Sequence, residues 1–204
     1  NEQFRRVAEI IEISFNKYGY NGILIGNPFN ETYYRFRADA ILYYSNGLIL
    51  IDFKDYKGII KLPQNSNEFS SNKWYNESIN DRTRLEIKAG ASFINPFRQL
   101  VSYRNAFREI LENNKYLNGI NPARVCIANI FSGPIEVHNE VPRNLPYYKL
   151  IQESDLSNFL YDFASENTYK EDIAKALKSI FPAERWDKSL EISIPEKIIK
   201  KEII

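Results

Sequence analysis

Residues 36–54 read FRADAILYYSNGLILIDFK, and this stretch decides the fold. Two apolar runs, residues 36–44 and 48–54, flank the turn sequence SNG at 45–47. An Asn-Gly pair between apolar runs is a strong short-range signal for a β-hairpin, because a type I′ turn needs positive φ at both central positions. Both runs are apolar at consecutive positions, which is typical of strands covered on both faces. The stretch therefore predicts a hairpin in the middle of a sheet.

Two carboxylates and a lysine interrupt this apolar hairpin, namely Asp39, Asp52 and Lys54. Burying an ionised group is costly unless it is paired or bound to a metal ion. Because side chains alternate along a strand, Asp52 and Lys54 share one face. With Asn46 and Gly47 as the turn residues, Asp39 lies opposite Lys54 and diagonal to Asp52, within about 5–8 Å. A three-residue loop would instead place Asp39 on the other face.

Two carboxylates at that separation suit a hard divalent cation, because Mg²⁺ accepts one or two carboxylates and keeps positions for water and phosphate. A neighbouring ammonium can orient an attacking water or stabilise charge on a phosphate. The alternative is a structural ion pair at a strand end, and similar triplets do occur at residues 55–57 and 86–88. Only residues 52–54 end an apolar strand whose hairpin partner also carries an aspartate. This context favours a site for phosphodiester hydrolysis.

Apolar periodicity around the hairpin predicts the rest of the fold. Helices are expected over residues 4–18, from 95–96 to about 113, near 154–164 and near 169–181. Further strands are expected over residues 23–26, 58–62, 124–131 and 147–151, with 58–62 continuing the hairpin as a meander. This order predicts an α/β (α+β) fold with a mixed central sheet and helices on both faces. We expect residues 1–182 to form this domain and residues 183–204 to be a charged tail or a linker toward a further domain.

The composition of the 204 residues narrows the chemistry. The only cysteine, Cys126, cannot form an internal disulfide, and the only histidine, His138, excludes mechanisms that need two histidines. The chain has no Gly-rich phosphate loop, no apolar run of membrane-spanning length and no signal-peptide pattern at its start, so we expect a cytoplasmic location. An active site in this chain is therefore expected to consist of carboxylates, lysine and amides.

The motifs resemble those of the PD-(D/E)xK nuclease superfamily, which has a restriction-endonuclease-like fold. Asp39 is followed after twelve residues by the triplet DFK at 52–54. Three further features resemble the nuclease-related domain (NERD) family: Gly58 after the Asp-x-Lys strand, Trp74 in the next segment, and NPFRQ at 95–99, which matches the family pattern Asn-Pro-x-x-Gln. The resemblance covers residues 1–131.

This resemblance implies roles for individual residues. Asp39, Asp52 and the carbonyl of Phe53 would bind Mg²⁺ or Mn²⁺, Lys54 would be the catalytic lysine, and Gln99 would be an active-site polar residue. The implied activity is metal-dependent nicking or endonuclease cleavage of DNA. Some members of the family are fused to a helicase or another DNA-processing domain, which implies a fused or associated partner of that kind.

The sequence departs from the family pattern at two points. Asp52 stands where the narrower family more often has glutamate, although aspartate is common in the wider superfamily. The glutamate often found in the first helix of this fold has two candidate matches, Glu9 and Glu12, of which helical geometry places Glu12 nearer the apolar stripe.

Two alternatives to a nuclease stay open at this stage. One is a catalytically silent nucleic-acid-binding or assembly module of the same fold. The other is a structural α/β interaction domain, which would place Asp39 and Lys54 on opposite faces of the sheet.

Basic residues at 82, 84, 88, 98, 104 and 108 could form a groove for DNA or a solvated face. The balanced net charge of +1 predicts modest DNA affinity, and hence help from a homodimer partner or a fused domain.

Overall fold

The computed structural model describes residues 2–45, 47–63, 65–90, 92–165, 169–182 and 191–193. Its larger sheet has six strands in the order β10-β1-β2-β3-β7-β9. They are β1 (Gly22–Gly26), β2 (Ala40–Tyr44), β3 (Gly47–Lys54), β7 (Val125–Phe131), β9 (Tyr148–Gln152) and β10 (Glu191–Ser193). Strands β1, β2 and β3 are antiparallel, whereas β3, β7 and β9 are parallel. The sheet is therefore mixed.

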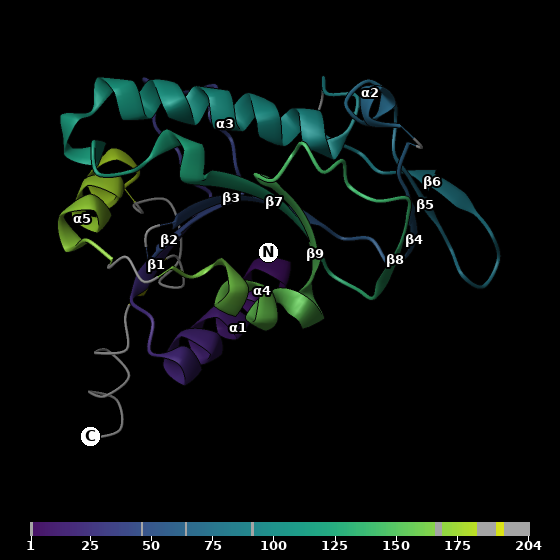
Figure 1. Ribbon diagram of the computed structural model, residues 1–204, viewed down its shortest axis with the longest axis horizontal. Coiled ribbons are helices and arrows are strands. Elements are labelled where there is room, and N and C mark those ends of the chain that lie inside the picture. The colour runs from purple at the N-terminus through teal and green to yellow at the C-terminus, as the bar shows by residue number, and fades with distance from the viewer. Residues whose placement is uncertain are drawn as a thin grey trace.

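Helices cover both faces of this sheet (Figure 1). They are α1 (Glu2–Tyr18), α3 (Pro96–Asn113), α4 (Leu156–Phe163) and α5 (Glu171–Ile180). Helices α1 and α4 share a buried cluster with Leu42 and Ile49, while α3 and α5 share another with Ile41 and Leu50. Alternate residues of each hairpin strand thus enter opposite cores. The predicted α/β (α+β) class, a mixed sheet flanked by helices on both faces, is confirmed.

The hairpin forms as predicted, but its turn is one residue earlier. Tyr44 pairs with Gly47, so the turn begins at Ser45, which has a φ of 53°. Asn46 lies outside the described residues. Gly47 belongs to the strand, where a Cβ would come within 2.2 Å of the Phe163 ring. The glycine thus serves close packing in the strand, which the turn signal did not indicate.

This earlier turn moves the pairing by two residues and so keeps every side chain on its predicted face. Ala40 pairs with Ile51, and the Asp39 amide donates to the Ile51 carbonyl over 2.9 Å. Continuing the register by one position places Asp39 opposite Asp52. The prediction that Asp39 lies directly opposite Lys54 is therefore wrong, whereas the predicted common face of the three charges is correct.

A smaller sheet of four strands, in the order β6-β5-β4-β8, projects from the end of the hairpin (Figure 1). It contains β4 (Gly58–Lys61), β5 (Tyr75–Glu77), β6 (Arg84–Glu86) and β8 (Ile135–His138), with the single-turn helix α2 (Ser66–Phe69) beside it. The expected meander is thus wrong for β4, because the chain leaves the larger sheet at Gly58, whose φ of +113° suits glycine. Strand β8, where the sequence predicts no element, is short and carries no apolar run.

The C-terminal segment adds an edge strand, because β10 pairs antiparallel with β1. Most of the predicted tail at 183–204 lies outside the described residues, so its boundary stays a prediction. Short 3₁₀ turns at Lys115–Leu117, Pro122–Arg124 and Glu153–Asp155 complete the described elements. None of the helices formed by the described residues combines the length and apolar character needed to cross a bilayer.

Candidate active site

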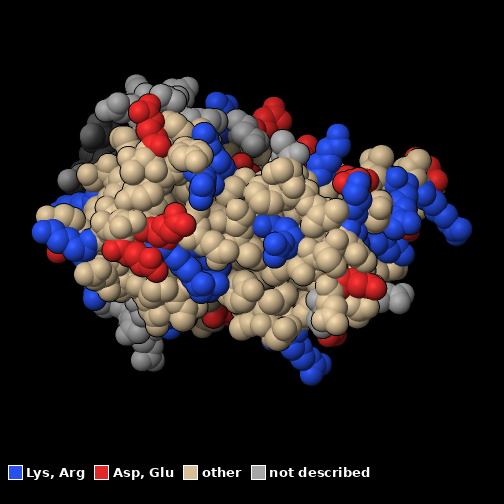
Figure 2. All heavy atoms as spheres, turned by 90° about the horizontal axis from the view of Figure 1, so that it is seen from above, with Lys and Arg blue, Asp and Glu red and all other residues tan. Residues whose placement is uncertain are grey.

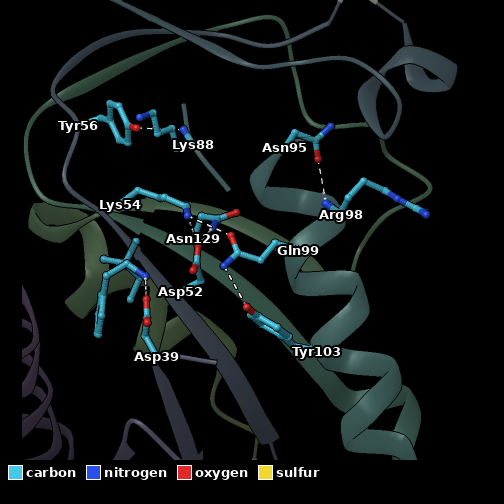
Figure 3. A network of polar contacts seen from close by, with 12 residues as sticks. Asp39, Asp52, Lys54, Tyr56, Lys88, Asn95, Arg98, Gln99, Tyr103 and Asn129 are labelled. Atoms are coloured by element: carbon cyan, nitrogen blue, oxygen red, sulfur yellow. Dashed lines mark hydrogen bonds and ion pairs between the residues drawn. The ribbon is translucent and has the colours of Figure 1, made fainter. Parts of the chain in front are cut away.

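The three charged residues of the hairpin meet beneath the first turn of α3 (Figure 3). Asp52 and Lys54 lie at the end of β3, with only 3% and 6% of their surfaces exposed. Their side chains point to the face that α3 covers, because they continue the alternation of Leu48 and Leu50. The structure therefore brings the predicted charges together, with Asp52 and Lys54 buried and Asp39 half-buried.

A chain of polar contacts joins β3 to α3. The Lys54 ammonium lies 2.8 Å from Asp52 Oδ2 and donates to Gln99 Oε1 over 3.2 Å. Gln99 Nε2 in turn donates to the Tyr103 hydroxyl, also over 3.2 Å. Gln99 and Tyr103 are four residues apart, so they lie on the same face of the helix. The predicted polar residue Gln99 thus contacts the candidate catalytic lysine directly.

The predicted start of α3 explains how Gln99 is placed. The side chain of Asn95 accepts a hydrogen bond from the Arg98 amide over 2.9 Å, and Pro96 occupies the first turn. The Asn95 side-chain amide also donates to the carbonyls of Phe69 and Asn72, over 3.1 Å and 2.8 Å. The asparagine therefore caps the helix and fixes it to the neighbouring loop. The pattern NPFRQ sets both where the helix begins and where Gln99 lies.

Asp39 is held by the strand opposite it. Its Oδ2 accepts a hydrogen bond from the backbone amide of Phe53 over 2.7 Å. Its carboxyl group also contacts that of Asp52, and Lys54 lies close enough to act on it electrostatically. Phe53, predicted as a metal ligand through its carbonyl, packs its ring against Phe4 at a centroid distance of 6.1 Å. Its backbone thus lies between the two aspartates while its side chain faces the other core.

Burial controls the protonation of both aspartates. Desolvation raises the pKa of Asp52 to about 6, more than the attraction of Lys54 and the hydrogen bond from Asn129 lower it, and the charge of Asp39 raises it further. Desolvation also raises the pKa of Asp39, against the lowering effects of the Phe53 amide and Lys54. Burial thus makes it costly to ionise both neighbouring carboxylates, and a divalent cation bound to them would offset that cost.

The donor set fits a cation that takes few protein ligands. The described residues contain no group of three or more His, Cys, Asp or Glu side chains able to hold a metal ion. Mg²⁺ and Mn²⁺ accept carboxylate, carbonyl and water oxygens, and Mg²⁺ usually binds through one or two carboxylates only. Asp39, Asp52 and the Phe53 carbonyl therefore fit such an ion and do not fit a zinc site.

Two buried partners of this site were not predicted from the sequence, Asn129 and Tyr148. Asn129 Nδ2 donates to Asp52 Oδ2 over 2.7 Å, and its Oδ1 accepts from the Tyr148 hydroxyl over 2.8 Å. The one available signal is that Asn129 is the only polar residue in the strand sequence VCIANIF of β7. This signal alone does not show that Asn129 lies beside Asp52. That also depends on the register of β7 against β3, which no local sequence pattern gives.

The candidates outside the hairpin have other roles. Glu9 and Glu12 are both exposed on α1, on the far side of the sheet from α3, so neither joins the carboxylates. Trp74 is fully buried, and Cys126 is buried in β7. Arg104, a candidate for a basic groove, is instead buried, with its Nε donating to the Val125 carbonyl over 2.7 Å.

The other candidate groove residues, at positions 82, 84, 88, 98 and 108, are exposed. Figure 2 shows Lys and Arg interspersed with Asp and Glu at the end of the molecule that the smaller sheet forms. Ion pairs there join Lys61 to Glu77 at 3.5 Å and Lys73 to Glu86 at 2.7 Å. This end of the protein is therefore a mixed surface and not a continuous basic face.

The raised pKa values predict how stability depends on pH when divalent metal is absent. The folded protein keeps a proton on Asp52 up to about pH 6, whereas an ordinary aspartate loses it near 3.8. Between these values the folded state binds more protons than the unfolded chain, so this group lowers the free energy of unfolding as pH rises. We expect Asp52→Asn to gain stability relative to wild type from about pH 4 to about pH 7. Urea unfolding in EDTA measures this, and a difference that is constant with pH would contradict it.

Fold and site together define a mixed α/β protein with an acidic pair and a lysine at the end of a buried strand. Residues 1–129 match the family described as the nuclease-related domain, NERD. The chain therefore belongs to the NERD family, as its motifs indicated. No curated protein and no solved structure gives a significant match to it.

Proposed function

We propose that this protein is a metal-dependent nuclease that hydrolyses phosphodiester bonds of DNA, by nicking or endonuclease cleavage. The observation that carries this proposal is that half-buried Asp39 and buried Asp52 and Lys54 lie together on one face of the sheet, with Lys54 2.8 Å from Asp52. A purely structural domain was expected to place Asp39 and Lys54 on opposite faces. Membership of the NERD family supports a nuclease independently of this geometry.

In this proposal some residues of the site bind the metal ion and others stabilise the charge that develops on the phosphate. Asp39, Asp52 and the Phe53 carbonyl would hold Mg²⁺ or Mn²⁺. When bound, such an ion supplies Lewis-acid activation of water and neutralises phosphate charge. Lys54 donates a hydrogen bond to the attacking water or to a non-bridging phosphate oxygen, where negative charge develops. Gln99 keeps the ammonium in place by accepting one of its three hydrogens.

DNA is the proposed partner, and this domain is expected to bind it modestly because its net charge is only +1. A fused or associated helicase or other DNA-processing domain, or a second copy of the chain, would add the affinity that the mixed surface lacks.

A plasmid-nicking experiment tests the proposal. We expect the wild-type protein to nick supercoiled plasmid with Mg²⁺ or Mn²⁺ and to lose this activity in EDTA. Asp52→Ala should not nick at any metal concentration, since it removes a proposed ligand and the partner of Lys54. Circular dichroism of the variant confirms that it is folded. Equal nicking by wild type and Asp52→Ala would refute the proposal.

The same experiment distinguishes the nuclease from the second candidate function. A catalytically silent nucleic-acid-binding or assembly module would retain DNA affinity in EDTA and would nick with neither metal. Fluorescence anisotropy with a labelled duplex, measured in EDTA and in Mn²⁺, provides the affinity. Binding without nicking would therefore replace the nuclease proposal with this module.

A further inference from the structure

The contact between Asn129 and Asp52 connects the two central parallel strands at the candidate site. Asn129 is on β7 in direct register with Asp52 on β3, and its exposed fraction is 0%. Every other side chain of β7 is apolar and packs in a core. Burying an amide costs free energy unless the amide makes hydrogen bonds, so an asparagine at this position needs hydrogen-bond partners. Its side-chain partners are Asp52 and Tyr148.

The chemistry of these partners fixes the orientation of the amide. An ionised carboxylate can only accept hydrogen bonds, so Asn129 must turn Nδ2 toward Asp52. Its Oδ1 then faces Tyr148, whose hydroxyl is able to donate. The Tyr148 ring is held among Phe69, Trp74 and Phe97, with centroid distances of 5.8, 6.0 and 5.1 Å. The carboxylate therefore selects the amide orientation, and the packed Tyr148 ring holds its hydroxyl where it can donate to Oδ1.

Asp52 has two hydrogen-bond donors beside it, Lys54 on its own strand and Asn129 on β7. Both contact the same carboxylate oxygen, Oδ2. Lys54 Nζ is 2.8 Å and Asn129 Nδ2 is 2.7 Å from Oδ2. Two donors at one oxygen fix the rotation of the carboxyl group, and neither uses Oδ1. Partners of this kind around metal ligands orient the ligand and tune its affinity.

We propose that Asn129 and Tyr148 are positioning residues that hold the Asp52 carboxylate ready for a divalent cation. This inference rests on the proposed nuclease function. It predicts that the Tyr148–Asn129–Asp52 relay sets metal affinity and turnover, while DNA binding is independent of it.

The test uses Asn129→Leu, Tyr148→Phe and the double variant. Mn²⁺ affinity is measured by calorimetry, plasmid nicking gives kcat and KM, and urea unfolding gives stability. We expect Asn129→Leu to weaken Mn²⁺ binding and to lower kcat by about 10-fold or more, with KM for DNA unchanged. Tyr148→Phe should also weaken Mn²⁺ binding and lower kcat, but by less. The Asn129 amide stays in place in this variant and only becomes free to rotate.

The double variant separates positioning from simple stabilisation. In Asn129→Leu the buried Tyr148 hydroxyl has lost its acceptor, and removing that hydroxyl should recover part of the lost stability. Metal affinity should not recover, because Asp52 still lacks its donor. Matched controls are Tyr44→Phe, whose buried hydroxyl donates to the Leu160 carbonyl over 2.8 Å, and Asn76→Leu, whose buried amide donates to the Lys57 carbonyl over 3.0 Å. Both should lose stability and keep Mn²⁺ affinity.

Three outcomes would overturn the inference. Wild-type metal affinity and kcat in Asn129→Leu, or in Tyr148→Phe if the leucine variant does not fold, would show that the relay does not position Asp52. Recovery of metal affinity together with stability in the double variant would show that its role is structural. A wild-type protein that neither binds Mn²⁺ nor nicks plasmid would instead overturn the proposed function, and the relay's role in metal binding with it.

Discussion

Replacing Lys54 with methionine is expected to reduce metal-dependent plasmid nicking by about 10²–10³-fold or more, the usual cost of losing one charge-stabilising donor. Methionine keeps most of the apolar stem and removes only the ammonium that contacts Asp52 and Gln99. Mn²⁺ should still bind, and more tightly than in wild type, because a positive charge has been removed beside the carboxylates. Loss of cleavage with retained metal binding would identify Lys54 as a catalytic residue.

The matched control is Lys115→Met, which removes the same charge from an exposed position at the opposite end of α3. It should nick plasmid as wild type does. Lys54→Arg distinguishes a general need for positive charge from a need for this ammonium, since the planar guanidinium is larger and makes its hydrogen bonds in a different geometry. Nicking at the wild-type rate by Lys54→Met would show that the buried pair with Asp52 is only structural.

Local patterns predicted the central hairpin, the long helix and the common face of the charges, because these depend on alternation and capping. Asn95 and Pro96 begin α3 where the sequence indicates, and Asp52 and Lys54 share a face whichever two residues form the turn. The direct partner of Asp39 could not be predicted in the same way. It depends on a two-residue difference in register that places Gly47 against Phe163.

Contacts between segments that are distant in the chain could not be predicted from the sequence. β4 leaves the larger sheet because of the backbone conformation at Gly58, and its partner β8 begins 77 residues later, at Ile135. Asn129 lies beside Asp52 through parallel pairing across the same separation in sequence. Parallel pairing requires a long crossover, so no short-range signal fixes its register. The candidate Asp-x-Lys motif is thus visible in the sequence, whereas the side chains of Asn129 and Tyr148 beside it are found only in the fold.

Replacing Trp74 with alanine is expected to lower the free energy of unfolding by about 3–5 kcal/mol, the range for large aromatic side chains removed from a core. Trp74 is fully buried, packs against Phe69 at a centroid distance of 4.9 Å, and donates from Nε1 to the Phe69 carbonyl over 3.1 Å. The cavity would lie next to Tyr148, so the loss of packing reaches the relay at Asn129 as well. Urea unfolding measures the change.

The consequences of this cavity distinguish a packing tryptophan from one that stacks on nucleic acid. Tyr116→Ala is the control, because 71% of that residue is exposed and its loss should change stability by no more than about 0.5 kcal/mol. Trp74→Phe should recover most of the lost packing while still lacking the Nε1 donor. If Trp74→Ala unfolded as wild type does but bound DNA more weakly, the residue would be a stacking platform. A large loss of stability, recovered by phenylalanine, would instead show that Trp74 supports the packing of Tyr148. The packing beside the smaller sheet would then be linked to the proposed metal-binding face of the larger sheet.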